Sequence, residues 1–543
     1  MYKDDVQYSQ YPESIKKEFT VPNITVPDIL AQTAANIPDH PALIYYEKKI
    51  LYKELHSLSI RFASALQNAG VQKGDRAAIM LPNCPQYVIA YYGILNAGAI
   101  VTQVNPMLVE RELLHILSDS QPETIVVYED LYPLVKKVQQ HTNIKTIVRV
   151  SFQPSSQTED YSFEAFLQSG SHPFQPASIE PEHDIALLQY TGGTTGRSKG
   201  AMLTHRNLVA NTMQSAEFFK HDIQYGKDRC LTVIPLFHVF GMTSGMNLSI
   251  FTGAANILLP RFQVEEVLQT IKKEQPTMFP GVPTMYIAIM NHPNAEEYNI
   301  DSIRVCNSGS APMPVGIMEE FEKKTGAKIL EGYGLSEASP VTHCNPAFAE
   351  RKPGSIGIGV PMTRYKIVDV ATGTREMPFG ETGELIISGP QIMKGYWNMP
   401  DETAHTLKDG WLYTGDLAKM DEEGYVYILD RKKDMIIASG YNIYPRDIEE
   451  VLYHHPKIQE AAVIGVPDAY RGETVKAIIV QKANTNLTKE EVKEYCAKNL
   501  SAYKVPKIIE FRSELPKTNV GKILRRALRE EEKANAVKIN PLN

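Results

Sequence analysis

Two kinds of apolar pattern alternate along most of the sequence before its C-terminal region. Short β-branched runs such as AIVTQV (99–104) and TIVVYE (124–129) predict strands, whereas VERELLHILSDS (109–120) and VEEVLQTIKKEQ (264–275) have the periodicity of amphipathic helices. Strands separated by helices of this length usually pair in parallel and are covered by those helices. The alternation therefore predicts an α/β fold built from helix-covered sheets.

Two segments give this prediction local detail. The most apolar run, VIAYYGILNAGAIV (88–101), contains Asn96 and is too short to cross a membrane, so it predicts a buried helix followed by a buried strand. Gly98 is suited to the position that follows the end of such a helix. Further along, Thr204 is placed to cap the helix predicted over THRNLVANTMQSAEFF (204–219).

The character of the sequence changes twice in its second half. From about residue 353, PGSIGIGV (353–360) and the glycines that follow separate short strands such as ELIISG (384–389), which predicts a smaller β-rich subdomain. After LDRKKDMI (429–436), two strand-like runs precede the helical TKEEVKEYCAKNL (488–500). We therefore expect a compact α+β domain at the C-terminal end.

Charge and cysteine content exclude several classes of partner and site. The 56 Lys and Arg residues against 63 Asp and Glu residues give a net charge of -7, which provides no general attraction for nucleic acid or anionic lipid. The five cysteines are far apart and form no CxxC pair, which supports neither a zinc knuckle nor a disulfide framework. The polar N-terminus lacks the apolar core of a signal peptide. We expect a cytoplasmic protein with no transmembrane segment; peripheral membrane contact and a homodimer stay open.

The glycine-rich stretch YTGGTTGRSKG (190–200) lies between a predicted strand and a predicted helix. Its glycines allow backbone N–H groups to point at a phosphate, its hydroxyl side chains add donors, and Lys199 adds a positive charge. The stretch has neither the Walker spacing nor a GxGxxG pattern. By itself it is either a phosphate loop of another kind or a glycine-rich surface turn.

Six further stretches follow this loop in a fixed order. They are PLFHVFG (235–241), SGSAPM (308–313), EGYGLSE (331–337), YTGD (413–416), DRKKDMIIASGYNIYP (430–445) and PKTNVGKILR (516–525). Together the seven stretches resemble the signature set of the adenylate-forming superfamily, which contains acyl-CoA synthetases, luciferases and adenylation domains. Within it, the chain is most similar to bacterial fatty-acyl-CoA ligases.

The resemblance implies a site for ATP, Mg²⁺ and coenzyme A. Adenine would lie against SGSAP and Tyr333, and the glycine-rich loop would hold the β- and γ-phosphates. Glu337 would bind Mg²⁺ with Thr194 nearby; hard cations favour such oxygen ligands. Ser336 stands where the family usually has Thr. The implied residues that bind ATP or coenzyme A are Thr191, Gly192, Gly193, Thr194, Thr195, Gly196, Lys199, Ser310, Ala311, Pro312, Glu331, Gly332, Tyr333, Gly334, Ser336, Asp416, Arg431 and Gly440.

Several of these residue types have ordinary structural explanations when each is taken alone. Glu337 could be a solvated glutamate, and Asp416 could cap the backbone of its own turn. The resemblance instead implies that Asp416 accepts both ribose hydroxyls, with help from Arg431. His238 could be a packed core residue; the resemblance implies that it positions the carboxylate and the α-phosphate. It needs no general-base role, because a carboxylic acid is already ionised near neutral pH.

Lys522 is one cation in a basic stretch, and in isolation it is expected to be solvated. The resemblance makes it the catalytic lysine of a mobile C-terminal domain, which stabilises the charge that develops when the carboxylate attacks the α-phosphorus. That domain would pivot at Lys433 between an adenylation pose and a thioester-forming pose, in which the loop around Gly440 guides pantetheine. The alternative for this loop is a strand-ending turn with Asn442 in a left-handed conformation. The implied domains are residues 1–432 and 433–543.

The implied activity is that of an ATP-dependent fatty acid:CoA ligase that acts on medium or long chains through an acyl-AMP intermediate. A tunnel lined by Phe237, Val239, Phe240, Met242 and FPGVPTMY (279–286) could hold the acyl chain, although apolar stripes are more often core. The alternatives are an aryl-acid CoA ligase resembling those for hydroxycinnamates, an acyl-AMP ligase that loads a carrier protein, and a non-catalytic nucleotide-binding protein.

Overall fold

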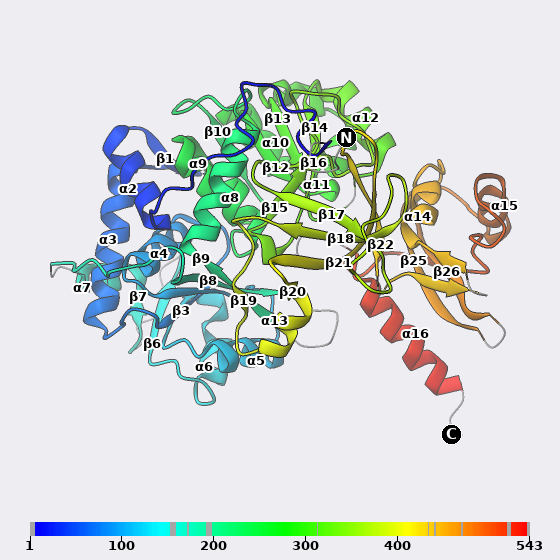
Figure 1. Cartoon of the computed structure of the whole chain (residues 1–543). Coiled ribbons are helices and arrows are strands. Elements are labelled where there is room, and N and C mark those ends of the chain that lie inside the picture. Colours follow the sequence, from blue (N-terminus) through cyan, green and yellow to red (C-terminus); the bar gives the residue numbers. More distant parts are fainter. Residues whose placement is uncertain are drawn as a thin grey trace.

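In the computed structural model, strands of the described residues form four sheets (Figure 1). The structure describes residues 6–152, 159–170, 173–191, 198–311, 313–432, 434–438, 441–468, 471–518 and 523–539. Two large sheets with their helices come first in the sequence, two smaller sheets follow from β17 (Arg364–Val368) onward, and β19 (Gly395–Tyr396) returns to one of the large sheets. This order confirms the predicted α/β fold with a β-rich part and a small C-terminal domain.

The first large sheet has eight strands in the order β19-β9-β8-β4-β3-β5-β6-β7. Its central strands pair in parallel, and β9 turns back antiparallel to β8, so the two strands flank the glycine-rich loop. The strands are β3 (Arg76–Met80), β4 (Ile100–Gln103), β5 (Thr124–Tyr128), β6 (Thr146–Val150), β7 (Tyr161–Ser162), β8 (Ile185–Thr191), β9 (Lys199–Thr204) and β19 (Gly395–Tyr396).

The second large sheet has nine strands in the order β16-β15-β14-β13-β12-β10-β11-β1-β2. Strands β10 to β14 pair in parallel, and the edges at β2, β15 and β16 are antiparallel. The strands are β1 (Pro41–Tyr45), β2 (Lys48–Leu51), β10 (Arg229–Thr232), β11 (Ala255–Leu258), β12 (Met278–Gly281), β13 (Val305–Ser308), β14 (Lys328–Gly334), β15 (Val341–Cys344) and β16 (Ile358–Gly359).

Helices cover these two sheets and carry the hydrophobic core. One cluster of buried side chains joins α3, α4 and α8 to the eight-stranded sheet, and another joins α10, α11 and α12 to the nine-stranded sheet. The helices are α2 (Val26–Asn36), α3 (Tyr52–Asn68), α4 (Pro85–Asn96), α5 (Glu110–Ser120), α6 (Tyr132–Gln139), α7 (Phe163–Ser169), α8 (His205–Phe218), α9 (Leu248–Thr252), α10 (Val264–Glu274), α11 (Pro283–Met290), α12 (Val315–Thr325) and α13 (Pro400–Thr406).

The predicted helix ends are confirmed. Helix α4 ends at Asn96, and Gly98 follows with φ +76°, a left-handed conformation that glycine adopts without strain. Thr204 caps α8, because its side chain accepts a hydrogen bond from the backbone N–H of Asn207, whose side chain accepts one from the N–H of Thr204.

The β-rich subdomain is an antiparallel sheet in the order β17-β18-β21-β20, with β22 paired to β21. It begins later than the sequence suggested, since the glycine-rich segment from residue 353 supplies β16 to the nine-stranded sheet. The strands are β17 (Arg364–Val368), β18 (Gly383–Ser388), β20 (Leu407–Lys408), β21 (Trp411–Met420) and β22 (Val426–Arg431).

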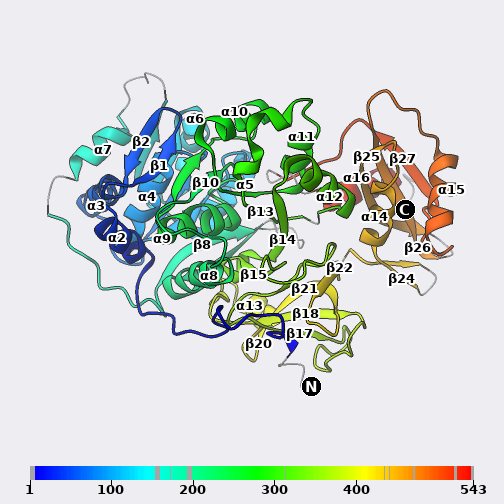
Figure 2. The ribbon, with the colours of Figure 1, turned by 90° about the horizontal axis from the view of Figure 1, so that it is seen from above.

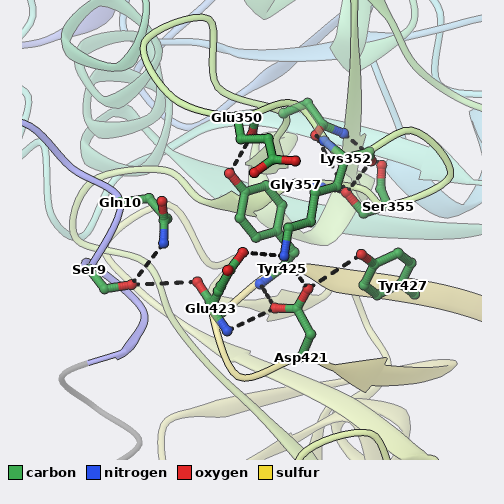
Figure 3. A network of polar contacts seen from close by, with 12 residues as sticks. Ser9, Gln10, Glu350, Lys352, Ser355, Gly357, Asp421, Glu423, Tyr425 and Tyr427 are labelled. Carbon is green, nitrogen blue, oxygen red and sulfur yellow. Dashed lines mark hydrogen bonds and ion pairs between the residues drawn. The ribbon is translucent and has the colours of Figure 1, made fainter.

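A polar network at the β21–β22 turn connects this subdomain to the N-terminal segment that contains Ser9 and Gln10 (Figure 3). Lys352 lies between Asp421 and Glu423, and its ammonium group is 4.5 Å from the ring centre of Tyr425. Ser9 reaches the backbone carbonyl of Glu423. These contacts fix the far end of the two strands that carry the YTGD and DRKKD motifs.

The C-terminal elements gather on one side of the molecule in both views (Figures 1 and 2). Their sheet has the order β24-β23-β26-β25, with β27 parallel to β26, and α14 and α15 share its main apolar cluster. The elements are β23 (Ile436–Ala438), β24 (Tyr441–Ile443), β25 (Ile458–Asp468), β26 (Gly472–Gln481), β27 (Ile508–Arg512), α14 (Pro445–Tyr453), α15 (Lys489–Asn499) and α16 (Arg525–Ile539).

Candidate active site

The carboxyl ends of three neighbouring parallel strands bring two motifs together. Gly281, Ser308 and Glu331 lie side by side in the register of β12, β13 and β14. Ligands of open α/β sheets bind at this edge, outside the carboxyl ends of the strands. SGSAPM leaves β13 here and EGYGLSE continues β14, so the two stretches predicted to border adenine are adjacent.

Tyr333, Asp416 and Arg431 form one group beside this edge, joined by a hydrogen bond and an ion pair. Asp416 and Arg431 face each other across β21 and β22, and the Arg431 Nε lies 3.3 Å from an Asp416 carboxylate oxygen. The Tyr333 hydroxyl donates to the other carboxylate oxygen. Among the described residues, the Asp416 side chain contacts Tyr333 and Arg431 and not the backbone of its own turn. The adjacent carboxylate raises the pKa of the Arg431 guanidinium. The structure thus unites three of the predicted nucleotide-binding residues.

Glu337 is held by a residue that the sequence analysis did not select. It lies in a 3₁₀ turn (Ser336–Ala338), and the hydroxyl of Tyr396 donates a 2.7 Å hydrogen bond to its Oε1. Tyr396 also lies under the Lys199 ammonium group, 5.3 Å from the ring centre, and Lys199 pairs with Glu402. Lys199 and Glu337, which the resemblance assigns to phosphate and metal, are thus joined through one aromatic ring.

His238 lies in the loop between β10 and the π-helix Gly241–Asn247. Its Nδ1 accepts a 3.3 Å hydrogen bond from the backbone N–H of Phe240, which fixes the ring relative to the loop. A side chain at Gly241 would meet the Pro235 carbonyl at 2.2 Å, so the tight turn requires glycine. Phe240 in turn contacts Gly309, because a Cβ there would lie 3.1 Å from its ring. PLFHVFG therefore packs directly against SGSAPM.

Glu331 is a buried carboxylate at the same edge. Burial raises its pKa to about 7, and the positive charge of Arg446 opposes that rise. Its Oε1 accepts from the backbone N–H of Met313, whereas its Oε2, the Asn307 Oδ1 and the Ser308 Oγ are buried without a hydrogen-bond partner among the described residues. Buried polar atoms rarely stay unpaired in proteins, so this edge is suited to a polar ligand such as a nucleotide base.

Comparison with known proteins agrees with this geometry. Residues 30–397 match the model of the "AMP-binding enzyme" family, and residues 447–522 match its C-terminal domain. The chain belongs to this family. It is 48% identical over 550 residues to a long-chain-fatty-acid–CoA ligase of Bacillus subtilis, with 97% of this chain and 98% of that protein covered.

Solved structures of MatB from Rhodopseudomonas palustris also match this AMP-binding enzyme. They are 30% identical to it and cover 94% of this chain and 99% of their own. The TM-score is 0.85 for the ATP-bound form and 0.75 for the apo form. The present arrangement is therefore more similar to the ATP-bound form than to the apo form.

Several predicted site residues of the AMP-binding enzyme lie outside the described residues. They are Gly192, Gly193, Thr194, Thr195, Gly196, Pro312, Lys433, Gly440 and Lys522, and of Thr191 only the backbone is described. Their assignments stay predictions. Nearby, Asn442 lies inside β24 and pairs with Ile437, so the backbone at this position is in a strand and not in a turn.

The proposed acyl tunnel also stays a prediction. Val239 and Met242 are buried in the cluster that joins the eight-stranded sheet, and Phe240, Phe279 and Tyr286 in the cluster of the nine-stranded sheet. Side chains of an ordinary hydrophobic core are buried in the same way, so their burial does not distinguish a tunnel from core packing. Val239, Phe240 and Met242 do, however, follow His238 directly, and Phe279 lies in β12, whose carboxyl end is at the nucleotide edge.

Three residues at the site escaped the sequence analysis: Tyr396, Glu402 and Arg446. Tyr396 and Glu402 lie between β18 and β20 of the β-rich subdomain in sequence, and Tyr396 comes close to Lys199 because β19 pairs with β9 in the eight-stranded sheet. The "KGYW" run around Tyr396 was the sequence pattern that could have indicated this residue.

No group of three or more His, Cys, Asp or Glu side chains suited to a metal occurs among the described residues. None of their helices is long and apolar enough to span a membrane.

Proposed function

We propose that this AMP-binding enzyme is an ATP-dependent long-chain fatty acid:CoA ligase. The observation that carries the proposal is the likeness to a long-chain-fatty-acid–CoA ligase over nearly the full length of both chains. The assembly of Tyr333, Asp416 and Arg431 beside the strand ends supports the nucleotide part of the reaction. Because ATP and CoA are cytoplasmic substrates and the five thiols are free and buried, we place the enzyme in the cytoplasm.

The reaction has two steps. A fatty carboxylate oxygen attacks the α-phosphorus of ATP, which forms acyl-AMP and releases pyrophosphate. The CoA thiolate then attacks the acyl carbonyl carbon, which forms the thioester and releases AMP. Asp416 would accept hydrogen bonds from the ribose hydroxyls, in place of its present contacts with Tyr333 and Arg431, and Tyr333 would offer a flat face to adenine.

Glu337 and Lys199 are suited to the phosphate end. A single carboxylate fits Mg²⁺, because this ion commonly binds one or two carboxylates together with substrate phosphates. The ion would neutralise phosphate charge when bound. Lys199, now paired with Glu402, would exchange that carboxylate for phosphate oxygens. His238, with its ring oriented by the Phe240 N–H, would position the fatty carboxylate.

Lys522 and Gly440 complete the proposal. Lys522 would stabilise the negative charge shared by the carboxylate and the α-phosphate during the first step. A loop around Gly440 would guide pantetheine in the second step. Rotation of a domain that begins at about Lys433 would bring first Lys522 and then the loop around Gly440 to the reacting groups. The same rotation would exclude water from acyl-AMP.

A pyrophosphate-release screen tests the proposal directly. The purified chain is incubated with MgATP and acetate, fatty acids of increasing length, or aryl acids, with and without CoA. We expect pyrophosphate release with fatty acids of long chain and acyl-CoA only when CoA is present. A preference for a hydroxycinnamate, transfer to a holo carrier protein in place of CoA, or background pyrophosphate release with every acid would each refute it in favour of a different function.

A further inference from the structure

Two buried carboxylates of the N-terminal part are contacted by guanidinium groups of the C-terminal part. Glu331 lies on β14, in the predicted adenine stretch, and Asp430 is the penultimate residue of β22. Arg446 reaches both from α14, and Arg525 reaches Asp430 from the start of α16. These contacts join the nucleotide edge to two helices that follow the expected pivot.

Arg446 makes the central contacts of this group. Its Nη1 donates a 2.6 Å hydrogen bond to the carbonyl of Ile428, and its backbone N–H donates to Asp430 at 3.2 Å. Its Nη2 lies 3.8 Å from the Glu331 Oε1, an ion pair that is longer than a hydrogen bond. The Arg446 side chain is 9% exposed, so an isolated positive charge would be costly at this position.

The same contact leaves hydrogen-bonding capacity unused. Within the part of the chain that the structure describes, the Arg446 Nη2 and the Glu331 Oε2 are both buried and lack a hydrogen-bond partner. A buried ion pair with unsatisfied atoms contributes little net stability. Removal of one partner is nevertheless costly, because the other charge is then buried without compensation. Such a contact can therefore favour one domain arrangement without preventing the domain from leaving it. A domain that must rotate requires a contact of this kind.

We propose that Arg446 is a positioning residue whose contacts with Glu331 and the β22 backbone hold the C-terminal domain in the arrangement described here, and that this arrangement favours adenylation over thioester formation. The proposal rests on the two-step reaction proposed above. Its direction follows from two observations: Glu331 belongs to the predicted adenine stretch, and the whole chain is more similar to the ATP-bound than to the apo form of MatB. Arg525, which is three residues beyond Lys522, contributes to the same cluster through Asp430 and Glu449.

A distance measurement tests the positioning role without catalysis. Dyes are attached to cysteines introduced at the exposed Glu297 and Lys498, since the native cysteines are buried. Single-molecule energy transfer in the nucleotide-free chain should show one main distance. We expect Arg446→Met to reduce that population at least twofold. Glu450→Gln, which removes the exposed partner one turn further along α14, is the matched control and should leave it unchanged.

The two half-reactions give the second readout. Pyrophosphate release without CoA reports adenylation, and acyl-CoA formation from supplied acyl-AMP reports the second step. We expect Arg446→Met to lower the ratio of the first rate to the second at least fivefold, and Arg446→Lys, which keeps the charge but loses the planar fork, to lower it less. A lysine variant with the full defect of the methionine variant would assign the effect to packing and overturn the proposal.

These outcomes separate the inference from the function on which it rests. An unchanged distance distribution together with an unchanged ratio in Arg446→Met overturns the positioning role. Equal loss of both half-reactions with an unchanged distance also overturns it, because that result is what general destabilisation produces. If the unmodified chain forms no acyl-AMP from any fatty acid, the proposed function fails, while the distance measurement still decides whether Arg446 holds the domain.

Discussion

The hydroxyl of Tyr396 donates a 2.7 Å hydrogen bond to Glu337, 59 positions earlier in the sequence. The same ring lies under Lys199, so one buried tyrosine contacts both the predicted metal ligand and the predicted phosphate-binding cation. Tyr396 can do so because β19 pairs with β9, which places it beside the end of the glycine-rich loop. The phosphate end of the site therefore depends on a residue outside every motif.

Tyr396→Phe should weaken Mg²⁺ dependence without unfolding the protein. Loss of a hydrogen bond of about 1 kcal/mol leaves Glu337 less well oriented, and we expect about a fivefold higher Mg²⁺ concentration at half-maximal pyrophosphate release. The control is Tyr427→Phe, which removes a hydroxyl that contacts Asp421 in the network of Figure 3. Identical Mg²⁺ titrations for the Tyr396 variant and the unmodified chain would contradict the role given to this hydrogen bond.

Asp416→Asn should raise the KM for ATP. The carboxylate accepts from Tyr333 and pairs with Arg431, and an amide cannot accept two ribose hydroxyls through both of its atoms. Hydrogen bonds to charged groups contribute about 1.5–3 kcal/mol, so we expect an increase of about 10- to 100-fold in steady-state assays. Lys432→Gln is the matched control, because Lys432 adjoins Arg431 but pairs with Glu384. An unaltered KM in the Asp416 variant would remove Asp416 from the ribose site.

The nine-stranded sheet and the local helix ends differ in how far the sequence could predict them. Gly98 and Thr204 were predicted correctly, because a helix end depends on the residues within one turn of it. Strand order was not predicted: β1 and β2 join the sheet beside β11, more than 200 residues later. Such pairing depends on long-range packing, which local patterns of one sequence do not encode.

The site shows the same difference between features that depend on local sequence and features that depend on long-range packing. Tyr333, Asp416 and Arg431 were predicted because each lies in a recognisable motif, and the structure brings them together. Tyr396 and Arg446 lie outside the seven stretches that carry the resemblance. Their contacts with Glu337 and Glu331 arise from strand pairing and domain packing, so only the folded structure reveals them.

Lys522→Ala and Gly440→Leu should affect opposite half-reactions. Loss of the lysine removes transition-state charge stabilisation, and we expect adenylation to fall about 10²-fold or more while thioester formation from supplied acyl-AMP is spared. A leucine at Gly440 should obstruct pantetheine and slow the CoA step more than adenylation. Separate rapid-quench assays of the two steps check both expectations. Equal loss of both steps in Lys522→Ala, or unchanged CoA kinetics in Gly440→Leu, would refute the two-pose assignment.

His343 should make the protein less stable in mild acid. It is fully buried against Tyr365, with ring centres 4.5 Å apart, and burial lowers its pKa from 6.5 to about 3. Because the folded-state pKa lies below the unfolded value, its contribution is fully present above pH 6.5 and is lost as the pH falls toward 3. The loss approaches about 1.4 kcal/mol per pH unit.

His343→Gln should therefore reduce the fall in the free energy of unfolding between pH 6.5 and 4.5. Urea titrations monitored by tryptophan fluorescence measure this free energy. His405→Gln, at an exposed position, is the control, and equally steep profiles for both variants would exclude His343 as the cause.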